Sequence, residues 1–101
     1  MPFQLDPLMY YAYVLLSSRD GKWYTGAASD LKARLREHEH GKVTSTRFRR
    51  PLQLIYYEAC LDGADAYRRE RYLKTGKGKR YLRQRLKTWW THLSQVELER
   101  H

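Results

Sequence analysis

Four side chains that can handle a proton or a phosphate lie near the start of the chain, at spacings that local structure can bring together. Tyr13 lies in an apolar run, Tyr24 follows after a turn, and Arg34 and His38 are one helical turn apart. Arginine presents a planar fork of donors that suits a phosphate, and histidine can accept a proton. A free phenol has a pKa near ~10 and is a poor base unless a nearby positive charge lowers that value. These residue types are compatible with a site that binds a phosphate and moves a proton. Tyrosines of the core and a surface arginine would give the same pattern.

Two strands and a helix are expected to position these side chains. Residues 10–17 are rich in Tyr, Val and Leu and predict a buried strand. An Asp-Gly turn leads into a second strand at 23–27 that pairs back on the first. Ser29 is expected to cap a helix that ends near His40, where Gly41 stops it.

The rest of the chain predicts one more strand and two more helices. Residues 42–51 form a basic loop, and 52–60 read as the third strand. Asp62 can cap a helix that ends near Gly76, and a further helix begins at about Lys79 with apolar residues at helical spacing. The order is strand, strand, helix, strand, helix, helix. It predicts an α+β fold, a small three-stranded antiparallel sheet flanked by helices.

The length of 101 residues predicts a single domain over 1–101. We expect its core at about 10–87, an extended lead-in at 1–9, and a C-terminal helical extension at 88–101. No signal-peptide pattern and no apolar run of ~18 residues is present, so we expect a cytoplasmic protein without membrane contact. The single cysteine agrees with a reducing compartment.

The charge of this chain points to a polyanionic partner. Net charge is +9, and residues 68–87 hold ten Lys or Arg and only one acid, Glu70. A basic protein whose charge only keeps it dispersed is the plain alternative. Two clusters are the expected contacts to a nucleic-acid backbone, namely Lys42, Arg47, Arg49 and Arg50 in the loop, and Lys74, Lys77, Lys79 and Arg80 around two glycines. Phe48 could stack on an unpaired base or pack in the core.

Glu70 is placed unusually for an acid. Ala66 lies four residues before it and Leu73 three after, so Glu70 shares the face of the helix that packs inward. A carboxylate on that face needs a partner, because burying a bare charge is unfavourable. The residues alone leave two interpretations open, an ion pair with an arginine, which they favour, and a metal ligand.

A series of short motifs carries a resemblance to a known family. They are Tyr11-Ala12-Tyr13, Tyr24-Thr25-Gly26, Ser29-Asp30-Leu31, Arg34-Leu35 with His38, Arg49-Arg50-Pro51-Leu52, Leu54-Ile55-Tyr56-Tyr57-Glu58, Arg68-Arg69-Glu70, Leu73-Lys74 and Gly76-Lys77-Gly78. Their order and spacing resemble the GIY-YIG nuclease superfamily, in particular its small single-domain bacterial members. These small members are similar to the N-terminal nuclease domain of the excision-repair endonuclease.

The resemblance implies a metal-dependent endonuclease that hydrolyses phosphodiester bonds, with DNA favoured over RNA, in repair, recombination or other nucleic-acid processing. It assigns Tyr13 to taking a proton from the attacking water and Tyr24 to positioning water and phosphate. Arg34 would clamp the phosphate, and His38 would line the site and orient water or act as an alternative base. Glu70 would bind one divalent ion, Mg²⁺ or Mn²⁺, so the resemblance favours the metal ligand over the ion pair.

The alternative function is a non-catalytic nucleic-acid-binding module on a nuclease-like fold. Glu70 distinguishes the two, since a pure binder gains nothing from an acid in its most basic segment. The chain departs from the family pattern at Ala27, where many relatives carry a polar side chain, and it contains no asparagine. Neither protein partners nor oligomeric state can be predicted.

Overall fold

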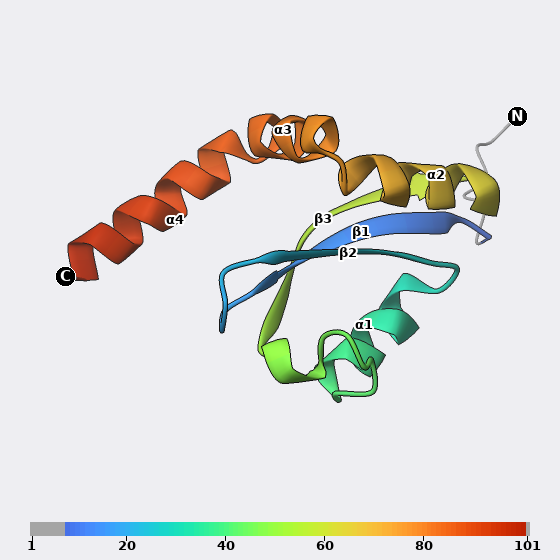
Figure 1. Cartoon of the computed structure of the whole chain (residues 1–101), viewed down its shortest axis with the longest axis horizontal. Helices are drawn as coiled ribbons and strands as arrows, with labels where there is room; N and C mark the ends of the chain where they lie inside the picture. The colour runs from blue at the N-terminus through green and yellow to red at the C-terminus, as the bar shows by residue number, and fades with distance from the viewer. Residues whose placement is uncertain (1–7, 101) are drawn as a thin grey trace, which may run out of the picture. The chain divides into compact units, whose positions relative to one another are not determined.

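The computed structural model describes residues 8–100, and the side chains of 8–93. The chain divides between Glu70 and Arg71 into two compact units. The first contains the sheet, the first helix and most of the second, and the second contains the remaining helices (Figure 1). The expectation of one domain over the whole chain stays a prediction.

The sheet of the first unit has three antiparallel strands in the order β2-β1-β3. They are β1 (Tyr10–Ser17), β2 (Trp23–Ala28) and β3 (Leu52–Cys60). The central strand β1 carries the apolar run and is buried from Ala12 onward. Tyr13 pairs with Gly26 of β2 on one side and with Tyr57 of β3 on the other. The middle of β1 is therefore enclosed on both edges.

Helix α1 (Leu31–Glu39) packs against the central strand. Leu31 joins Tyr13 and Leu15 of the central strand in a buried apolar cluster, and Leu35 packs against it. The expected cap at Ser29 was wrong by one residue, since Asp30 accepts the Ala33 N–H at 3.1 Å. Asp and Ser serve equally well as caps, so the sequence alone did not separate them.

Helix α2 (Gly63–Leu73) follows β3 directly. Asp62 caps it as expected, because its carboxylate accepts the Ala64 N–H at 2.8 Å. Arg69 donates to both carboxylate oxygens of Glu58 at 2.7 and 2.6 Å. This bidentate pair fastens α2 to β3 ahead of Glu70.

The second unit corrects two predicted boundaries. Gly76 and Gly78 do not break the chain between helices but form the first turn of α3 (Gly76–Arg85), which Thr75 caps by accepting the Gly78 N–H. A side chain at Gly78 would overlap the backbone of Tyr72, so the glycine permits a close approach of α2 to α3. The single predicted third helix is two helices, since α3 ends before Leu86 and α4 (Lys87–Arg100) begins after it. No glycine or proline marks that end in the sequence.

The predicted fold class is confirmed, an antiparallel three-stranded sheet with helices in the expected order. The basic loop at 42–51 contains a short 3₁₀ turn, η1 (Arg47–Arg49), before β3 begins. Among the helices of residues 8–100, none has the length and apolar composition needed to cross a membrane.

Candidate active site

Tyr13 lies at the centre of the site, and the glycine beside it makes room for its ring. The side chain is fully buried in the middle strand. A Cβ atom at Gly26 would lie 2.5 Å from the Tyr13 hydroxyl oxygen and 2.6 Å from Cζ. Real Cβ atoms essentially never come so close. The glycine of Tyr24-Thr25-Gly26 is therefore required by the packing of Tyr13 and not by its own backbone conformation, since its φ is not positive.

A chain of two buried hydrogen bonds runs from Tyr13 through His38 to Thr46. The Tyr13 hydroxyl lies 2.8 Å from Nε2 of His38, and Nδ1 of His38 lies 2.7 Å from Oγ1 of Thr46. His38 is 1% exposed and Thr46 is fully buried. The Tyr24 ring lies 5.1 Å from the His38 ring, edge to face. Both ring nitrogens of His38 are thus satisfied, and the imidazole is held by three residues from three segments.

Thr46 is a site residue that sequence reasoning missed. It belongs to the basic loop, where we expected only phosphate contacts. That loop is fastened to the β1–β2 turn, since Arg49 donates to Asp20 at 2.8 Å and its carbonyl accepts from Ser17 at 2.6 Å. The available signal was weak, a β-branched hydroxyl residue eight positions after His38. Thr46 reaches His38 only because the loop at 42–51 folds back on α1, and the sequence does not indicate that fold.

Burial sets the protonation of Tyr13 and His38. It raises the pKa of Tyr13 to about 12, and nearby Tyr24 and Glu70 add to the rise while a hydrogen bond from Arg34 opposes it. Burial lowers the pKa of His38 to about 4, and the positive charge of Arg34 acts in the same direction. At neutral pH the phenol is therefore protonated and the imidazole is neutral. Arg34 acts on the pKa of Tyr13 in the expected direction and lowers it, but desolvation by burial is the larger effect.

Arg34 connects the buried pair to the surface. Besides its hydrogen bond to Tyr13, its guanidinium donates to Glu37 at 2.8 Å, one turn along α1. These interactions raise the pKa of Arg34, the bond to Tyr13 most of all. The Arg34 side chain is 36% exposed. A phosphate can therefore reach this guanidinium from solvent, in competition with the carboxylate of Glu37.

Glu70 is the acidic member of the site. It lies on α2 and is half-buried, and its charge is close enough to raise the pKa of Tyr13. No group of three or more His, Cys, Asp or Glu side chains that could hold a metal occurs within the described residues. A single carboxylate fits a hydrated Mg²⁺ or Mn²⁺, because Mg²⁺ keeps several waters and often takes only one or two carboxylates from the protein. It does not fit a zinc site, which needs several protein ligands.

All five residues predicted to be catalytic thus come together, with Tyr13 in contact or within electrostatic reach of Tyr24, Arg34, His38 and Glu70. The predicted nucleic-acid-binding residues fall into two groups. Lys42 and Arg47 are exposed in the loop, whereas Arg49 is engaged with Asp20. Lys74, Lys77, Lys79 and Arg80 are exposed in the second unit.

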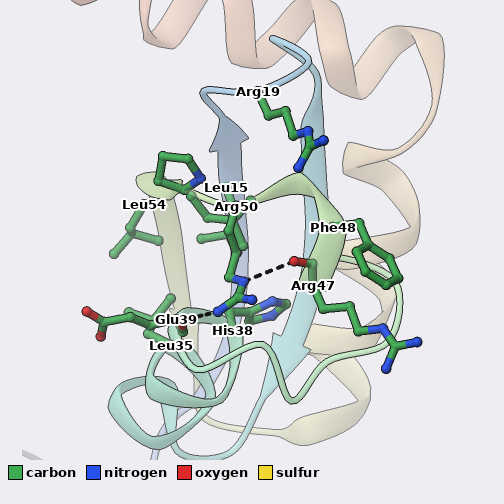
Figure 2. A pocket seen from close by; sticks show the side chains of 11 residues that line it. Leu15, Arg19, Leu35, His38, Glu39, Arg47, Phe48, Arg50 and Leu54 are labelled. Atoms are coloured by element: carbon green, nitrogen blue, oxygen red, sulfur yellow. Dashed lines mark hydrogen bonds between the residues drawn. The ribbon is translucent and has the colours of Figure 1, made fainter.

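Arg50 is anchored in another way. Its guanidinium donates to the backbone carbonyls of Arg47 and Glu39, both at 3.0 Å (Figure 2). It lies over Gly41, where a Cβ atom would be 2.8 Å from the guanidinium carbon. Gly41 has a φ of +73°, so it both ends α1 and leaves space for Arg50.

Comparison with known proteins gives one family and several relatives. The family model described as GIY-YIG catalytic domain matches residues 9–83. A UPF0213 protein of Staphylococcus epidermidis is 37% identical over 67 residues, which cover 65% of this chain and 80% of that protein. A UPF0213 protein of Staphylococcus aureus strain N315 is 36% identical over 75 residues, covering 73% and 90%. The solution NMR structure of a UPF0213 protein from Bacillus halodurans is 34% identical and covers 73% of this chain and 81% of that one, with a TM-score of 0.46.

Proposed function

This chain belongs to the GIY-YIG catalytic domain family, and from that premise we propose that it is a nuclease that hydrolyses phosphodiester bonds in nucleic acid, with DNA as its main substrate and a divalent cation as its cofactor. The family resemblance inferred from the sequence motifs is thereby confirmed, and the nuclease-type fold comes with it. Catalysis, substrate and metal are the parts that we propose.

One observation carries the proposal. A buried phenol is hydrogen-bonded to a neutral imidazole at 2.8 Å, beside a partly exposed guanidinium and a carboxylate. A protein that only attracts a polyanion needs exposed positive charge. It does not need an imidazole that is hydrogen-bonded to a buried phenol. Acid–base catalysis needs a donor and an acceptor at hydrogen-bond distance.

Tyr13 and His38 would act together on the attacking water. We propose that the Tyr13 oxygen takes the water proton while the phenol passes its own proton to Nε2 of His38. If the Tyr13 hydroxyl donates to Nε2, the proton of the neutral imidazole is on Nδ1, and Thr46, 2.7 Å from Nδ1, would be a positioning residue that accepts this proton and keeps the Nε2 lone pair directed at Tyr13. In the resting site the proton stays on Tyr13, because the pKa of Tyr13 is about 12 and that of His38 about 4.

Substrate binding would reduce the difference between the pKa values of Tyr13 and His38. Arg34 lowers the pKa of His38 by its charge, so a phosphate bound to Arg34 would offset this effect and make the imidazole a better acceptor. The same guanidinium would stabilise the charge that develops on the phosphate oxygens. A divalent cation held by Glu70 would supply positive charge that favours the Tyr13 phenolate and the departing oxygen. Tyr24, edge-on to His38, would orient the water.

The test is cleavage of end-labelled single-stranded, duplex and forked DNA and of RNA, with Mg²⁺, Mn²⁺ or EDTA. Glu70→Ala is compared with Asp65→Ala, a matched control that removes an exposed acid from the same helix. We expect cutting that depends on the metal, is lost in Glu70→Ala and is kept in Asp65→Ala. The ranking of the four substrates then shows the preferred nucleic acid.

Two outcomes would contradict the proposal. Binding of every substrate without cutting by the wild type would leave the non-catalytic binding module as the function. Cutting that survives unchanged in Glu70→Ala would show that Glu70 does not hold the metal.

A further inference from the structure

A pocket lies between α1, β1, β3 and the loop that carries η1 (Figure 2). Its volume is about 690 Å³, within the range of ~300–1,000 Å³ that is usual for small-molecule sites. Four leucines line it, Leu15, Leu35, Leu52 and Leu54. These walls would favour a flat apolar group and would not take a bare phosphate, because they offer no donors to replace its water.

The rim of the pocket is aromatic and cationic. Phe48 is 70% exposed, and the guanidinium of Arg47 lies 4.6 Å from the centre of its ring. Arg19 and Arg50 also line the pocket, and the Arg50 side chain runs through the middle of the view in Figure 2 to its two carbonyl partners. Within the described residues, none of these three arginines forms a salt bridge, whereas Arg49 nearby is paired with Asp20. A pocket lined by leucines, an exposed aromatic ring, three arginines and one acid, Glu39, suits a planar group attached to a negatively charged chain.

We propose that this pocket binds one unpaired nucleobase of the substrate strand. Phe48 would stack on the face of the base, and Arg19 and Arg47 would contact the flanking phosphates. A base inside a duplex presents only its edges, since its faces are covered by neighbouring base pairs, whereas an unpaired base can stack on an aromatic ring. The inference deepens the proposed function and rests on it.

His38 links the pocket to the catalytic residues. His38 lines the pocket, and its Nε2 atom lies 2.8 Å from the Tyr13 hydroxyl. A base held in the pocket would therefore belong to a nucleotide at or next to the bond that is cut. The pocket would make the enzyme prefer strands with an unpaired base at that position.

The experiment measures binding in EDTA, so that no cutting occurs. The probes are a short single-stranded oligonucleotide, its duplex, and the same strand with single abasic positions, each fluorescently labelled. Phe48→Ala is compared with Tyr67→Ala, which removes another exposed aromatic ring from the first unit. Phe48→Trp, which keeps the stacking surface, serves as a rescue, and circular dichroism verifies that all variants fold.

Stacking of one base is worth ~1–3 kcal/mol, so we expect Phe48→Ala to weaken single-strand binding by about tenfold. Duplex binding, Tyr67→Ala and Phe48→Trp should change little. One abasic position should weaken wild-type binding by a similar factor and should have no effect in Phe48→Ala, because both changes remove the same contact.

Equal losses for single strand and duplex in Phe48→Ala would overturn the inference, as would the same abasic sensitivity in Phe48→Ala and wild type. A Phe48→Ala chain that binds single strands as tightly as the wild type would also overturn it, and would leave the pocket to a different ligand such as a peptide. These binding results are obtained in EDTA, so a failure of the pocket inference can be distinguished from a failure of the nuclease proposal, which is judged by metal-dependent cutting.

Discussion

Replacing Gly26 by alanine tests how the site is packed. A Cβ atom there would lie 2.5 Å from the Tyr13 hydroxyl oxygen, 2.6 Å from Cζ and 3.0 Å from Cε1. The ring cannot remain in place, because Tyr13 is fully buried between two neighbouring strands. Gly26→Ala should therefore displace Tyr13 from His38.

The expected magnitude has two parts. Overpacking a buried position destabilises by ~1–3 kcal/mol, and losing the Tyr13–His38 hydrogen bond adds ~0.5–1.5 kcal/mol. We expect the free energy of unfolding to fall by about 2–4 kcal/mol. Cleavage should fall further than the folded fraction does, because the proton acceptor is no longer at 2.8 Å.

Urea denaturation and the cleavage assay measure the two effects. Gly76→Ala is the matched control, since nothing lies within 4 Å of a Cβ atom there. Combining Gly26→Ala with Tyr13→Phe should restore part of the stability, because the nearest clashing atom is the hydroxyl, but no activity. A Gly26→Ala protein with wild-type stability and turnover would refute this explanation of the Tyr-x-Gly motif.

Three further predictions concern the residues around His38. Thr46→Val leaves Nδ1 of His38 buried without a partner, so the free energy of unfolding, measured in urea, should fall by ~1–3 kcal/mol. The rate of cleavage should fall as well. Glu37→Gln frees Arg34 from its ion pair at 2.8 Å, and because such exposed pairs are worth ~0.2–1 kcal/mol, the Kd for an oligonucleotide should fall by about 1.4- to fivefold. The pKa of His38 is about 4 in the folded chain and ~6.5 when unfolded, so the unfolded chain takes up the proton first as the pH falls. The stability contributed by His38 should be fully present above pH ~6.5 and lost towards pH ~4, by up to about 3 kcal/mol, and denaturation series should show no such component in His38→Gln.

Each of these changes has a control and a contradicting result. Thr44→Val removes an exposed hydroxyl from the same loop, and equal effects of the two threonine variants would disprove a special role of Thr46. Asp65→Asn opens another exposed i,i+3 pair. If it tightened binding as much as Glu37→Gln, the gain would reflect net charge alone. A His38→Gln protein with the same acid dependence as wild type would assign that dependence to other groups.

Local patterns in the sequence predicted much of the fold. The apolar run of β1, the Asp-Gly turn and Pro51 before β3 placed the strands closely, since each signal acts on its neighbours. The division of the last helix at Leu86 could not be predicted, because neither glycine nor proline stands there. Helix periodicity simply continues through it.

The sequence predicted which residues form the site, but it did not predict their burial or their hydrogen-bond partners. Tyr13, Arg34 and His38 lie on adjacent elements, so their spacing alone brought them together. The burial that gives Tyr13 a pKa of about 12 depends on packing from both strands and the loop. The use of Arg49 as an anchor and of Thr46 as a partner of His38 depends on how residues 42–51 fold back, which no periodicity indicates.

The hydrogen-bond chain through His38 closes over short stretches of sequence, with separations of 25 and 8 residues. All three residues precede β3 in the chain, and N-terminal segments fold first during synthesis. We therefore expect the Tyr13–His38–Thr46 arrangement to form on a nascent chain before α2 has left the ribosome. Glu70 is the last of the proposed catalytic residues to be synthesised, so a nascent chain that emerges beside ribosomal RNA would lack the carboxylate on which cutting is proposed to depend.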